Sequence, residues 1–506
     1  MKPTTIPTTL VACLLATAHV LSAATPQWPQ FRGPNGSGIA PDDARPPLHF
    51  GPETNRLWKT AVPPGLSAPV VWGDRLFLTG LASNRLVTLA YDTRTGHELW
   101  RQVAPADKIE ECHRFSSPAA PTPCTDGERV YAYFGSFGLI AYDFAGKEVW
   151  RRPFERLPSS YGTATSPILA GGQLIVQRDG DSTNAQLIAI SPATGKTVWE
   201  SPRPLAGQSY STPMVWRHDG VEELMVLGGN RLAAYSLNGG SQNWWGKGWG
   251  FASVTTPVAG DGMLFTGSSG MGDPSEPPDP VLDWKRMIAD YDANRDGQIA
   301  LGELPEQAGW QIRKEVPKAT PGNFMPLRRL LGFAEANTNQ LVTLAEWDAL
   351  DAESRDRFNA DRFAAIRPGG NGDSTETHVP WETAQGLPEM PSPLFYRGRI
   401  CFVRDGGMWS VIEPKTGKRL IDRERLGTGG QMVASPIAAN GYIFLANESG
   451  TFAVLRAGDT LAVVAVNKLG ESVRCTPAIA GDAIYVRTAG HLWAFGQATN
   501  PRNMTE

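Results

Sequence analysis

The chain has 506 residues and is rich in glycine (54) and proline (41), whereas charged residues make up only 19%. This composition favours many short strands joined by tight turns, and it argues against a helical bundle or a long disordered tail. A net charge of −4 without a basic run gives no electrostatic footprint of a nucleic-acid-binding protein.

Residues 1–24 have the features of a secretory signal peptide. Lys2 provides the positive start, residues 10–21 are mostly apolar, and Ser22–Ala24 supply small residues for cleavage. The apolar run is too short to remain as a membrane anchor. Cys13 follows Leu-Val-Ala and so resembles a lipobox, but most of the apolar core comes after it, which makes an outer-membrane lipoprotein the less favoured alternative. We expect a periplasmic or secreted protein with no further transmembrane anchor.

One unit repeats along residues 25–496. It opens with a small residue and a proline, followed by an apolar run, a Gly/Asp turn and a second apolar run, as in Ala68–Phe77. Successive prolines lie 41 to 54 residues apart except for one interval of 136 residues; they are Pro69, Pro123, Pro167, Pro213, Pro257, Pro393, Pro436 and Pro477. Units of this length are typical of propeller blades. The sequence therefore predicts an all-β fold, an eight-bladed β-propeller of four-stranded antiparallel blades.

The second half of the unit reads as a hairpin with a tryptophan on its outer strand. Its pattern, Ala-x-Asp-x-x-Thr-Gly-x-x-x-Trp, occurs at Ala90–Trp100, and the same spacing of Ala, Gly and Trp recurs at Ala189–Trp199 and Ala234–Trp244. We expect the glycine to take a positive φ and the tryptophan to cover the neighbouring blade. Blades six and seven depart from the pattern, because Ile421 and Ala462 stand where tryptophan is expected.

The last unit lacks its fourth strand. His491–Phe495 is its third strand, and no further strand pattern follows before the tail at 497–506. Near the other end of the chain, Asn55–Lys59 matches the outer strand and carries Trp58. We predict that this segment completes blade eight, because closing the ring removes an exposed sheet edge.

The tryptophan pattern resembles that of pyrroloquinoline quinone-like propeller repeats over roughly residues 50–496, apart from an insertion. Trp28–Gly38 is similar to the opening of a bacterial exported subgroup of that family. The resemblance implies that ligands bind over a central funnel, on the face with the turns between the second and third strands. It implies either a binding protein, similar in fold to the outer-membrane barrel-assembly propeller lipoprotein, or a quinone-dependent alcohol or sugar dehydrogenase.

The strand pattern stops after residue 273 and resumes at 361, so residues 274–360 are an insertion into the middle turn of blade five, between propeller segments 25–273 and 361–496. Within it, residues 292–303 satisfy the EF-hand calcium loop, with Gly297 at the sharp turn. The expected Ca²⁺ ligands are Asp292, Asn294, Asp296, the Gln298 carbonyl and Glu303. The alternative is an acidic turn between two helices.

A second loop, residues 335–346, makes the insertion a small α-helical EF-hand pair. It has Glu335 where Asp is preferred and Gln340 where Gly is preferred. We expect it to pair with the first loop through a short strand, and its calcium binding is left open.

Polar side chains gather at the predicted funnel face. The candidates for ligand or cofactor binding are His113, Arg178, Asp179, Arg404, Asp405, Glu448, Arg474 and Arg487. A ring of alternating charge suits a small polar or anionic ligand, and the alternative is that these charges pair around a solvated funnel. A Cys112–Cys124 disulfide is plausible in an oxidising compartment, whereas Cys401 and Cys475 read as buried thiols.

Pyrroloquinoline quinone is not supported by the residues. The chain has no adjacent cysteine pair of the kind that the resemblance would place under that cofactor, and no hydrolase or phosphate-loop motif, so no catalytic residue is predicted. We predict a monomeric, exported, calcium-binding scaffold with a protein or glycan partner at the funnel face. The alternatives are a quinone-dependent oxidoreductase and a carbohydrate-binding accessory protein that uses Tyr210, Trp245 and Trp249 as exposed aromatic residues.

Overall fold

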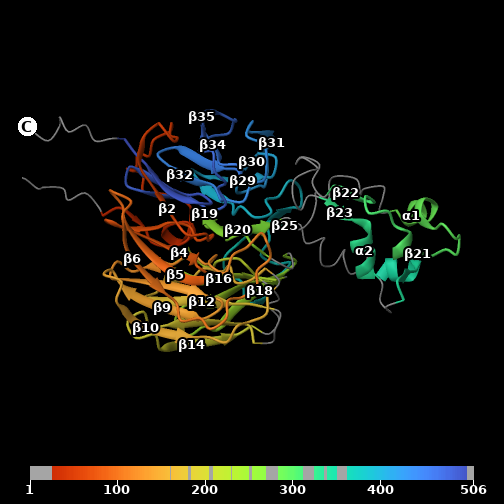
Figure 1. The fold of residues 1–506 in the computed structure, drawn as a ribbon, viewed down its shortest axis with the longest axis horizontal. Coiled ribbons are helices and arrows are strands. Elements are labelled where there is room, and N and C mark those ends of the chain that lie inside the picture. The colour runs from red at the N-terminus through yellow and green to blue at the C-terminus, as the bar shows by residue number, and fades with distance from the viewer. Residues whose placement is uncertain are drawn as a thin grey trace, which may run out of the picture.

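The structure is an eight-bladed β-propeller with a small helical module at one side (Figure 1). This computed structural model describes residues 25–497 except 160, 181–183, 204–208, 230, 250–252, 269–282, 312–323, 335–338 and 350–361. The predicted fold, eight blades of four antiparallel strands, is confirmed. The predicted signal peptide lies outside the described residues. No helix in the described part of the chain is long and apolar enough to cross a membrane.

Blades 1 to 4 follow one another along the chain. Blade 1 contains β3 (Val70–Trp72), β4 (Arg75–Ala82), β5 (Arg85–Asp92) and β6 (Glu98–Val103), and blade 2 contains β7 (Cys124–Thr125), β8 (Arg129–Phe134), β9 (Gly138–Asp143) and β10 (Glu148–Pro153). Blade 3 contains β11 (Ile168–Ala170), β12 (Gln173–Arg178), β13 (Gln186–Ile190) and β14 (Thr197–Pro202), and blade 4 contains β15 (Met214–His218), β16 (Val221–Gly228), β17 (Arg231–Ser236) and β18 (Gln242–Lys247).

Blades 5 to 8 complete the ring. Blade 5 contains β19 (Val258–Gly260), β20 (Met263–Ser268), β25 (Arg362–Ile366) and β27 (Trp381–Thr383), and blade 6 contains β28 (Leu394–Tyr396), β29 (Arg399–Arg404), β30 (Met408–Ile412) and β31 (Arg419–Arg425). Blade 7 contains β32 (Ile437–Ala439), β33 (Tyr442–Ala446), β34 (Thr451–Arg456) and β35 (Val463–Lys468), and blade 8 contains β36 (Ala478–Ala480), β37 (Ala483–Arg487), β38 (His491–Phe495) and β2 (Arg56–Ala61). The pairing of β2 with β38 confirms the predicted closure by both ends of the chain.

The propeller has two ends that must be distinguished. The turns between the second and third strands of each blade lie at one end, which we call the insertion face because the helical module leaves blade 5 there. The turns between the first and second strands, and between the third and fourth, lie at the other end, which we call the opposite face. This follows from the antiparallel order of the strands within each blade.

Tryptophans on the outer strands dock on the next blade, as predicted. The indole Nε1 of Trp58 donates to the Thr93 carbonyl (2.8 Å), and four more tryptophans repeat the contact: Trp100 to Phe144 (3.0 Å), Trp150 to Pro192 (2.8 Å), Trp199 to Leu237 (2.9 Å) and Trp381 to Pro414 (2.8 Å). The ring covers the turn glycine; a Cβ on Gly96, at φ +72°, would lie 2.5 Å from Trp58. Glycine is therefore needed there both for its backbone angle and for space.

One position in this pattern was predicted wrongly. In every docked blade the tryptophan pairs with a small residue of the third strand, and in blade 6 Ile421 takes this place opposite Val411. In blade 7, however, Val454 pairs with Ala465 and not with Ala462. Strand β35 begins only at Val463, so Ala462 still belongs to the preceding turn and the tryptophan position falls three residues later than predicted, at Ala465.

Hydroxyl groups link the blades around their inner ends. In six of the eight junctions, the backbone N–H before the repeat proline donates to the Ser or Thr hydroxyl at the same position in the next blade. The contacts are Ala68 to Thr122 (2.9 Å), Thr122 to Ser166 (3.0 Å), Ser166 to Thr212 (3.2 Å), Thr256 to Ser392 (3.0 Å), Ser392 to Ser435 (2.9 Å) and Ser435 to Thr476 (3.1 Å). We call this the hydroxyl ring. At the junction of blades 4 and 5 the Thr256 hydroxyl is buried and has no partner among the described residues, and at the junction of blades 8 and 1 the position is Ala68.

The N-terminal segment, residues 26–40, crosses the centre of the propeller and contacts every blade. Strand β1 (Gln27–Trp28) pairs with β3, and a 3-10 turn (Pro34–Gly36) follows. Further contacts join Pro29 to Thr125, Gln30 to Leu169, Asn35 to Val215, Gly36 to Thr256, Arg32 to Pro393, Ile39 to Ala438 and Pro26 to Gly481. This contact with all eight blades gives the Trp28–Gly38 motif a structural role.

The helical module contains α1 (Trp284–Tyr291), β21 (Ile299–Ala300), a 3-10 turn (Leu301–Glu303), β22 (Gly309–Gln311), β23 (Phe324–Pro326), α2 (Leu327–Ala334), β24 (Leu341–Val342) and a helical turn at 344–349. It has its own apolar core, centred on Met287, Leu327 and Trp347. The module stands beside the propeller in Figure 1. Strands β20 and β25 on either side of it keep a regular register of five pairs, so the insertion does not interrupt blade 5.

Candidate functional site

The charged residues predicted to bind a ligand lie at the insertion face, and most of them are engaged within the protein. Arg487, only 1% exposed, donates to the carbonyls of Ser67 (3.1 Å), Thr79 (2.9 Å) and Pro63 (2.9 Å) and to the Ser67 hydroxyl (2.7 Å). Burial lowers the pKa of this guanidinium. Since Arg487 belongs to blade 8 and its acceptors flank blade 1, it bridges the junction at which the hydroxyl ring is missing.

Asp179 forms a buried ion pair that the sequence did not indicate. Its two carboxylate oxygens accept from Arg203 at 2.9 and 3.0 Å, and Arg203 also donates to the Tyr235 hydroxyl of blade 4 (2.8 Å). Burial opposes the charge of Arg203, but Asp179 outweighs it, and the pKa of Arg203 is raised. Arg178 donates to the Glu155 carbonyl and lies over the Phe154 ring at 4.5 Å. These groups hold blades 2, 3 and 4 together.

The remaining charges connect loops. Asp405 accepts the Met432 N–H (2.6 Å), which ties blade 6 to the loop before blade 7. Arg474 contacts Glu448 (3.4 Å) and donates to the Phe115 carbonyl (2.6 Å), so it joins the loop before blade 8 to the loop before blade 2. Arg404 is buried beside Asp405.

Aromatic rings from three loops stack at the insertion face. The centroid distances are 5.3 Å between Phe115 and His113, 4.8 Å between His113 and Tyr161, and 5.5 Å between Tyr161 and Tyr210. We call these four residues the aromatic ladder. Arg114 and Arg474 lie over the Phe115 ring at 4.8 and 5.7 Å. Tyr161 is 41% exposed, so the ladder presents ring surface with cations beside it.

Two aromatic residues predicted to be exposed are not. Trp249 is 2% exposed and Tyr210 is 9% exposed, while Trp245 is half-buried under Arg231 and Lys247. These predictions failed because the exposure of a strand residue depends on the loops that cover the strand. Here residues 372–375, which include β26 (Gly372–Asp373), lie along the edge of blade 4.

Beneath the aromatic ladder lies a buried carboxylate, Glu110. Its Oε2 accepts from the N–H and the hydroxyl of Thr163 (both 3.3 Å), whereas Oε1 has no partner among the described residues. Burial raises the pKa of Glu110, against the bonds from Thr163. The next cysteine, Cys112, has its pKa raised to about 12 by burial and by Glu110.

The proposed Cys112–Cys124 disulfide is absent, and both cysteines are free. Cys124 is fully buried in β7, where it packs in the cluster between blades 2 and 3. Cys112 lies in the loop before that strand and faces Gly162. Cys401 and Cys475 are buried thiols, as expected.

The predicted calcium loop is a tight turn with its side-chain oxygens on the inside. Asp292 accepts the N–H groups of Asp296 (3.2 Å) and Gly297 (2.9 Å), and Asn294 also accepts that of Asp296 (2.9 Å). Gly297 has φ +78°. Glu303 accepts the Ala300 N–H (3.0 Å). No group of three or more His, Cys, Asp or Glu side chains in the described residues is arranged to hold a metal. Calcium binding therefore stays a prediction.

The second loop mirrors the first where it is described. Ile299 of β21 pairs with Val342 of β24, which is the short strand pairing that the sequence predicted between the loops. Glu346 accepts the Thr343 N–H (3.0 Å), just as Glu303 accepts that of Ala300. Gln340 takes φ +62°, the conformation for which glycine is preferred. Glu335 and Asn337 lie outside the described residues.

The docked tryptophans and the ring of blades define an eight-bladed β-propeller, as predicted, and the predicted resemblance to pyrroloquinoline quinone-like repeats is supported over blades 1 to 4. The family model described as outer membrane protein assembly factor BamB matches residues 50–160 and 84–256, which span blades 1 to 4. No curated protein sequence matches the chain.

Solved structures resemble the whole propeller. BamB from Moraxella catarrhalis is 11% identical, over 87% of this chain and 99% of that one, with a TM-score of 0.52. A europium-containing methanol dehydrogenase is 11% identical, over 93% and 98%, with a TM-score of 0.53. A quinohemoprotein alcohol dehydrogenase from Pseudomonas putida HK5 is 11% identical, over 93% and 80%, with a TM-score of 0.50. At this identity the likeness shows the fold alone.

Proposed function

We propose that the protein is an exported, non-catalytic binding or scaffold propeller whose partner docks on the insertion face. The observation that carries this proposal is the aromatic ladder with Arg114 and Arg474 beside it. Exposed rings next to cations are typical of surfaces that bind proteins or glycans. The neighbouring charges of Asp179, Arg203 and Arg487 are satisfied internally and so serve structure. The likeness to BamB supports a scaffold of this kind.

Site-specific crosslinking tests the docking face. A photoreactive amino acid replaces Tyr161, and the matched control carries it at Val198, which is 52% exposed on the outer strand of blade 3. In envelope fractions of the host cell we expect a discrete adduct from position 161 and none from position 198. Equal adducts from both positions, or none from position 161, would contradict a partner at the ladder.

Export through residues 1–24 is part of the same proposal. N-terminal sequencing of the protein recovered from a periplasmic fraction should give a start at or near Thr25. Recovery of the uncleaved chain in the cytoplasm would refute it.

We further infer that the helical module is an EF-hand pair that binds Ca²⁺ at its first loop. Asp292, Asn294, Asp296, the Gln298 carbonyl and Glu303 would hold the ion, an all-oxygen set of the kind that Ca²⁺ prefers. The inward oxygens of this loop and its pairing with the second loop support the inference. The ion would neutralise the clustered carboxylates and order the module, whereas the propeller closes through its own contacts.

Isothermal titration separates the two loops. The Asp292→Ala/Glu303→Ala double variant should lose calcium uptake, while Glu346→Ala should keep most of it. Calcium uptake that survives in the double variant would overturn the assignment. Far-ultraviolet circular dichroism during chelation gives a second readout, since only the helical signal should fall.

A quinone-dependent oxidoreductase is the second candidate, and the likeness of fold to methanol and alcohol dehydrogenases favours it. Mixing the purified protein with pyrroloquinoline quinone and Ca²⁺ tests it. A bound-cofactor absorption band together with dye-linked alcohol oxidation would replace the scaffold proposal.

A further inference from the structure

A pocket of about 610 Å³ opens on the opposite face, away from the aromatic ladder. The N-terminal segment forms one wall, and the turns of blades 1, 2 and 3 form the others. The residues around it are Pro29, Gln30, Asn35, Trp72, Thr125, Asp126, Arg129, Leu169, Gly172, Ser191, Pro192 and Ala193. Pockets of about 300–1,000 Å³ are of the size that proteins use for small molecules.

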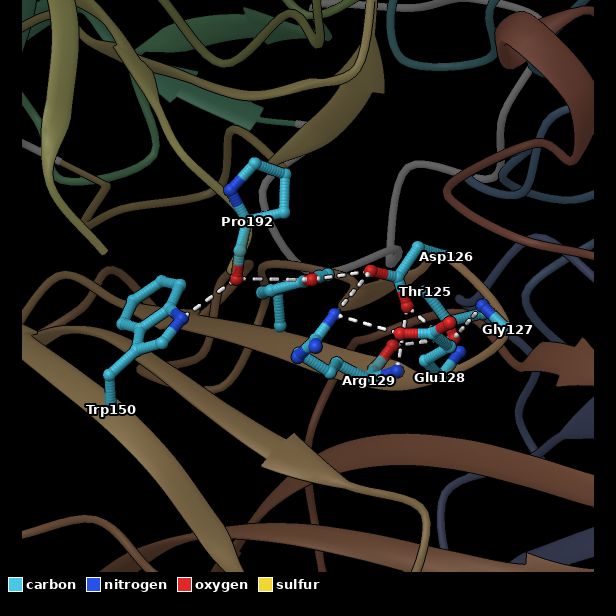
Figure 2. A network of polar contacts seen from close by, with 8 residues as sticks. Thr125, Asp126, Gly127, Glu128, Arg129, Trp150 and Pro192 are labelled. Atoms are coloured by element: carbon cyan, nitrogen blue, oxygen red, sulfur yellow. Dashed lines mark hydrogen bonds and ion pairs between the residues drawn. The ribbon is translucent and has the colours of Figure 1, made fainter. Parts of the chain in front are cut away.

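The walls of the pocket are held in place by a polar network (Figure 2). The Pro192 carbonyl accepts from the Trp150 indole (2.8 Å) and from the Tyr131 hydroxyl (3.3 Å). The single Tyr131 O–H proton is shared with Asp126, whose carboxylate is nearer (2.6 Å) and in turn accepts the Arg129 N–H (2.6 Å). The turns of blades 2 and 3 that face the pocket are therefore joined through one tyrosine. A site fixed in this way loses little conformational entropy when a ligand binds.

One wall offers an apolar platform. Trp72 is half-buried, and the Gly127 backbone supports its ring, because a Cβ on that glycine would lie 2.5 Å from the indole. Pro29, Leu169 and Pro192 extend the apolar surface. The Trp72 Nε1 donates to no acceptor in the described part of the chain, so the platform also carries a free donor.

The polar groups of the pocket select against a charged anion. Asp126 and Glu128 lie beside the single cation Arg129, at 3.5 and 3.2 Å from it, so the local charge is net negative. Arg129 has five N–H donors and three partners, Asp126, Glu128 and Tyr131, and its side chain is 26% exposed. Spare donors, the partly exposed carboxylate of Asp126 and an apolar ring face suit a neutral ligand that has hydroxyl groups on one side and C–H groups on the other.

We propose that this pocket is a binding site for a neutral saccharide of one to three rings. The C–H face of a sugar ring would pack on Trp72, while its hydroxyl groups would accept from Arg129 and Gln30 and donate to Asp126. The site is separate from the aromatic ladder, so it stands or falls independently of the function proposed above.

Titration of the full chain with maltose, cellobiose and N,N′-diacetylchitobiose, followed by calorimetry and tryptophan fluorescence, tests the site. We expect at least one of these sugars to bind, and Trp72→Leu to weaken it at least about tenfold. The matched control is Trp284→Leu, a half-buried tryptophan of the helical module that lies outside the pocket, and it should leave affinity unchanged. Thermal melts check that both variants fold.

Two outcomes would overturn the proposal. The first is that none of the three sugars binds, or that Trp72→Leu binds as well as wild type. The second is that the neutral peptide acetyl-tetraproline amide binds in a Trp72-dependent manner while the sugars do not, which would make the ligand a peptide. A Tyr161→Ala variant should retain sugar binding, since the ladder is on the other face; loss there would place the sugar at the aromatic ladder.

Discussion

The hydroxyl ring makes a sharp prediction, because two threonines occupy the same repeat position with opposite bonding. Thr122 accepts the buried Ala68 N–H at 2.9 Å, whereas the buried Thr256 hydroxyl meets no partner in the described part of the chain. Thr→Val is nearly isosteric and removes only the hydroxyl. Thr122→Val leaves a buried N–H unpaired and should lower the free energy of unfolding by about 1–3 kcal/mol. Thr256→Val removes an unsatisfied polar atom and should be neutral, or should stabilise by about 1 kcal/mol.

Urea unfolding followed by tryptophan fluorescence measures this difference. The midpoints should separate the two variants at unchanged m-values, because neither substitution alters the surface exposed on unfolding. Thr122→Ser keeps the acceptor and should recover most of the loss. If Thr256→Val costs as much as Thr122→Val, the hydroxyl bonds do not hold the ring together and the two positions matter only for packing.

Two further predictions follow from the docking and closure contacts. Gly195 has φ +71°, and a Cβ added there would lie 2.8 Å from Trp150, so Gly195→Ala should lower the free energy of unfolding by at least about 2 kcal/mol. Gly262 has φ +77° with open space around it, so Gly262→Ala should cost only about 1 kcal/mol. Thermal denaturation compares the two variants, and equal losses would refute a steric contribution from Trp150. Burial alone would raise the pKa of Glu471, but hydrogen bonds from Thr488, His491 and Lys59 lower it to about 2. The carboxylate therefore stabilises the fold above its unfolded pKa of about 4.5, and this contribution is lost as the pH falls toward 2. The stability gap between wild type and Glu471→Gln should close over that range, and a gap that stays constant with pH would exclude the mechanism.

Much of the propeller could be predicted because its repeat is governed by local chemistry. The small residue before each proline indicates the start of an inner strand, and the spacing of Gly and Trp indicates the docked hairpin. The number of blades and the closure through Trp58 could therefore be predicted from the sequence. The hydroxyl ring left a readable signal too, since seven of the eight residues before the repeat prolines are Ser or Thr and only Ala68 differs. From the sequence alone these residues indicate only a preference for small side chains.

What escaped prediction depends on contacts between distant segments. The pocket beside Trp72 requires the N-terminal segment and three separate turns, and no spacing in the sequence brings them together. The Asp179–Arg203 pair joins the residues that follow the second and fourth strands of blade 3, and its burial depends on contacts with blade 4. The failed Cys112–Cys124 disulfide shows the same limit: proximity in sequence favoured it, but burial of Cys124 between two blades placed its thiol out of reach.

The two gaps in the hydroxyl ring also explain how this propeller carries an insertion. At the junction of blades 8 and 1, Arg487 replaces the missing hydroxyl through its bonds to Ser67 and Thr79. At the junction of blades 4 and 5, β26 from the last turn of blade 5 pairs in parallel with β18, and Arg362 donates to the Lys247 carbonyl (2.6 Å). Both substitutes act at places where the chain departs from the plain repeat. Blade 5 is therefore held to its neighbour at its outer edge while its middle turn carries the helical module. The insertion face gains the module without opening the ring, because β20 and β25 keep their pairing and the ring closes at another junction, where β2 pairs with β38.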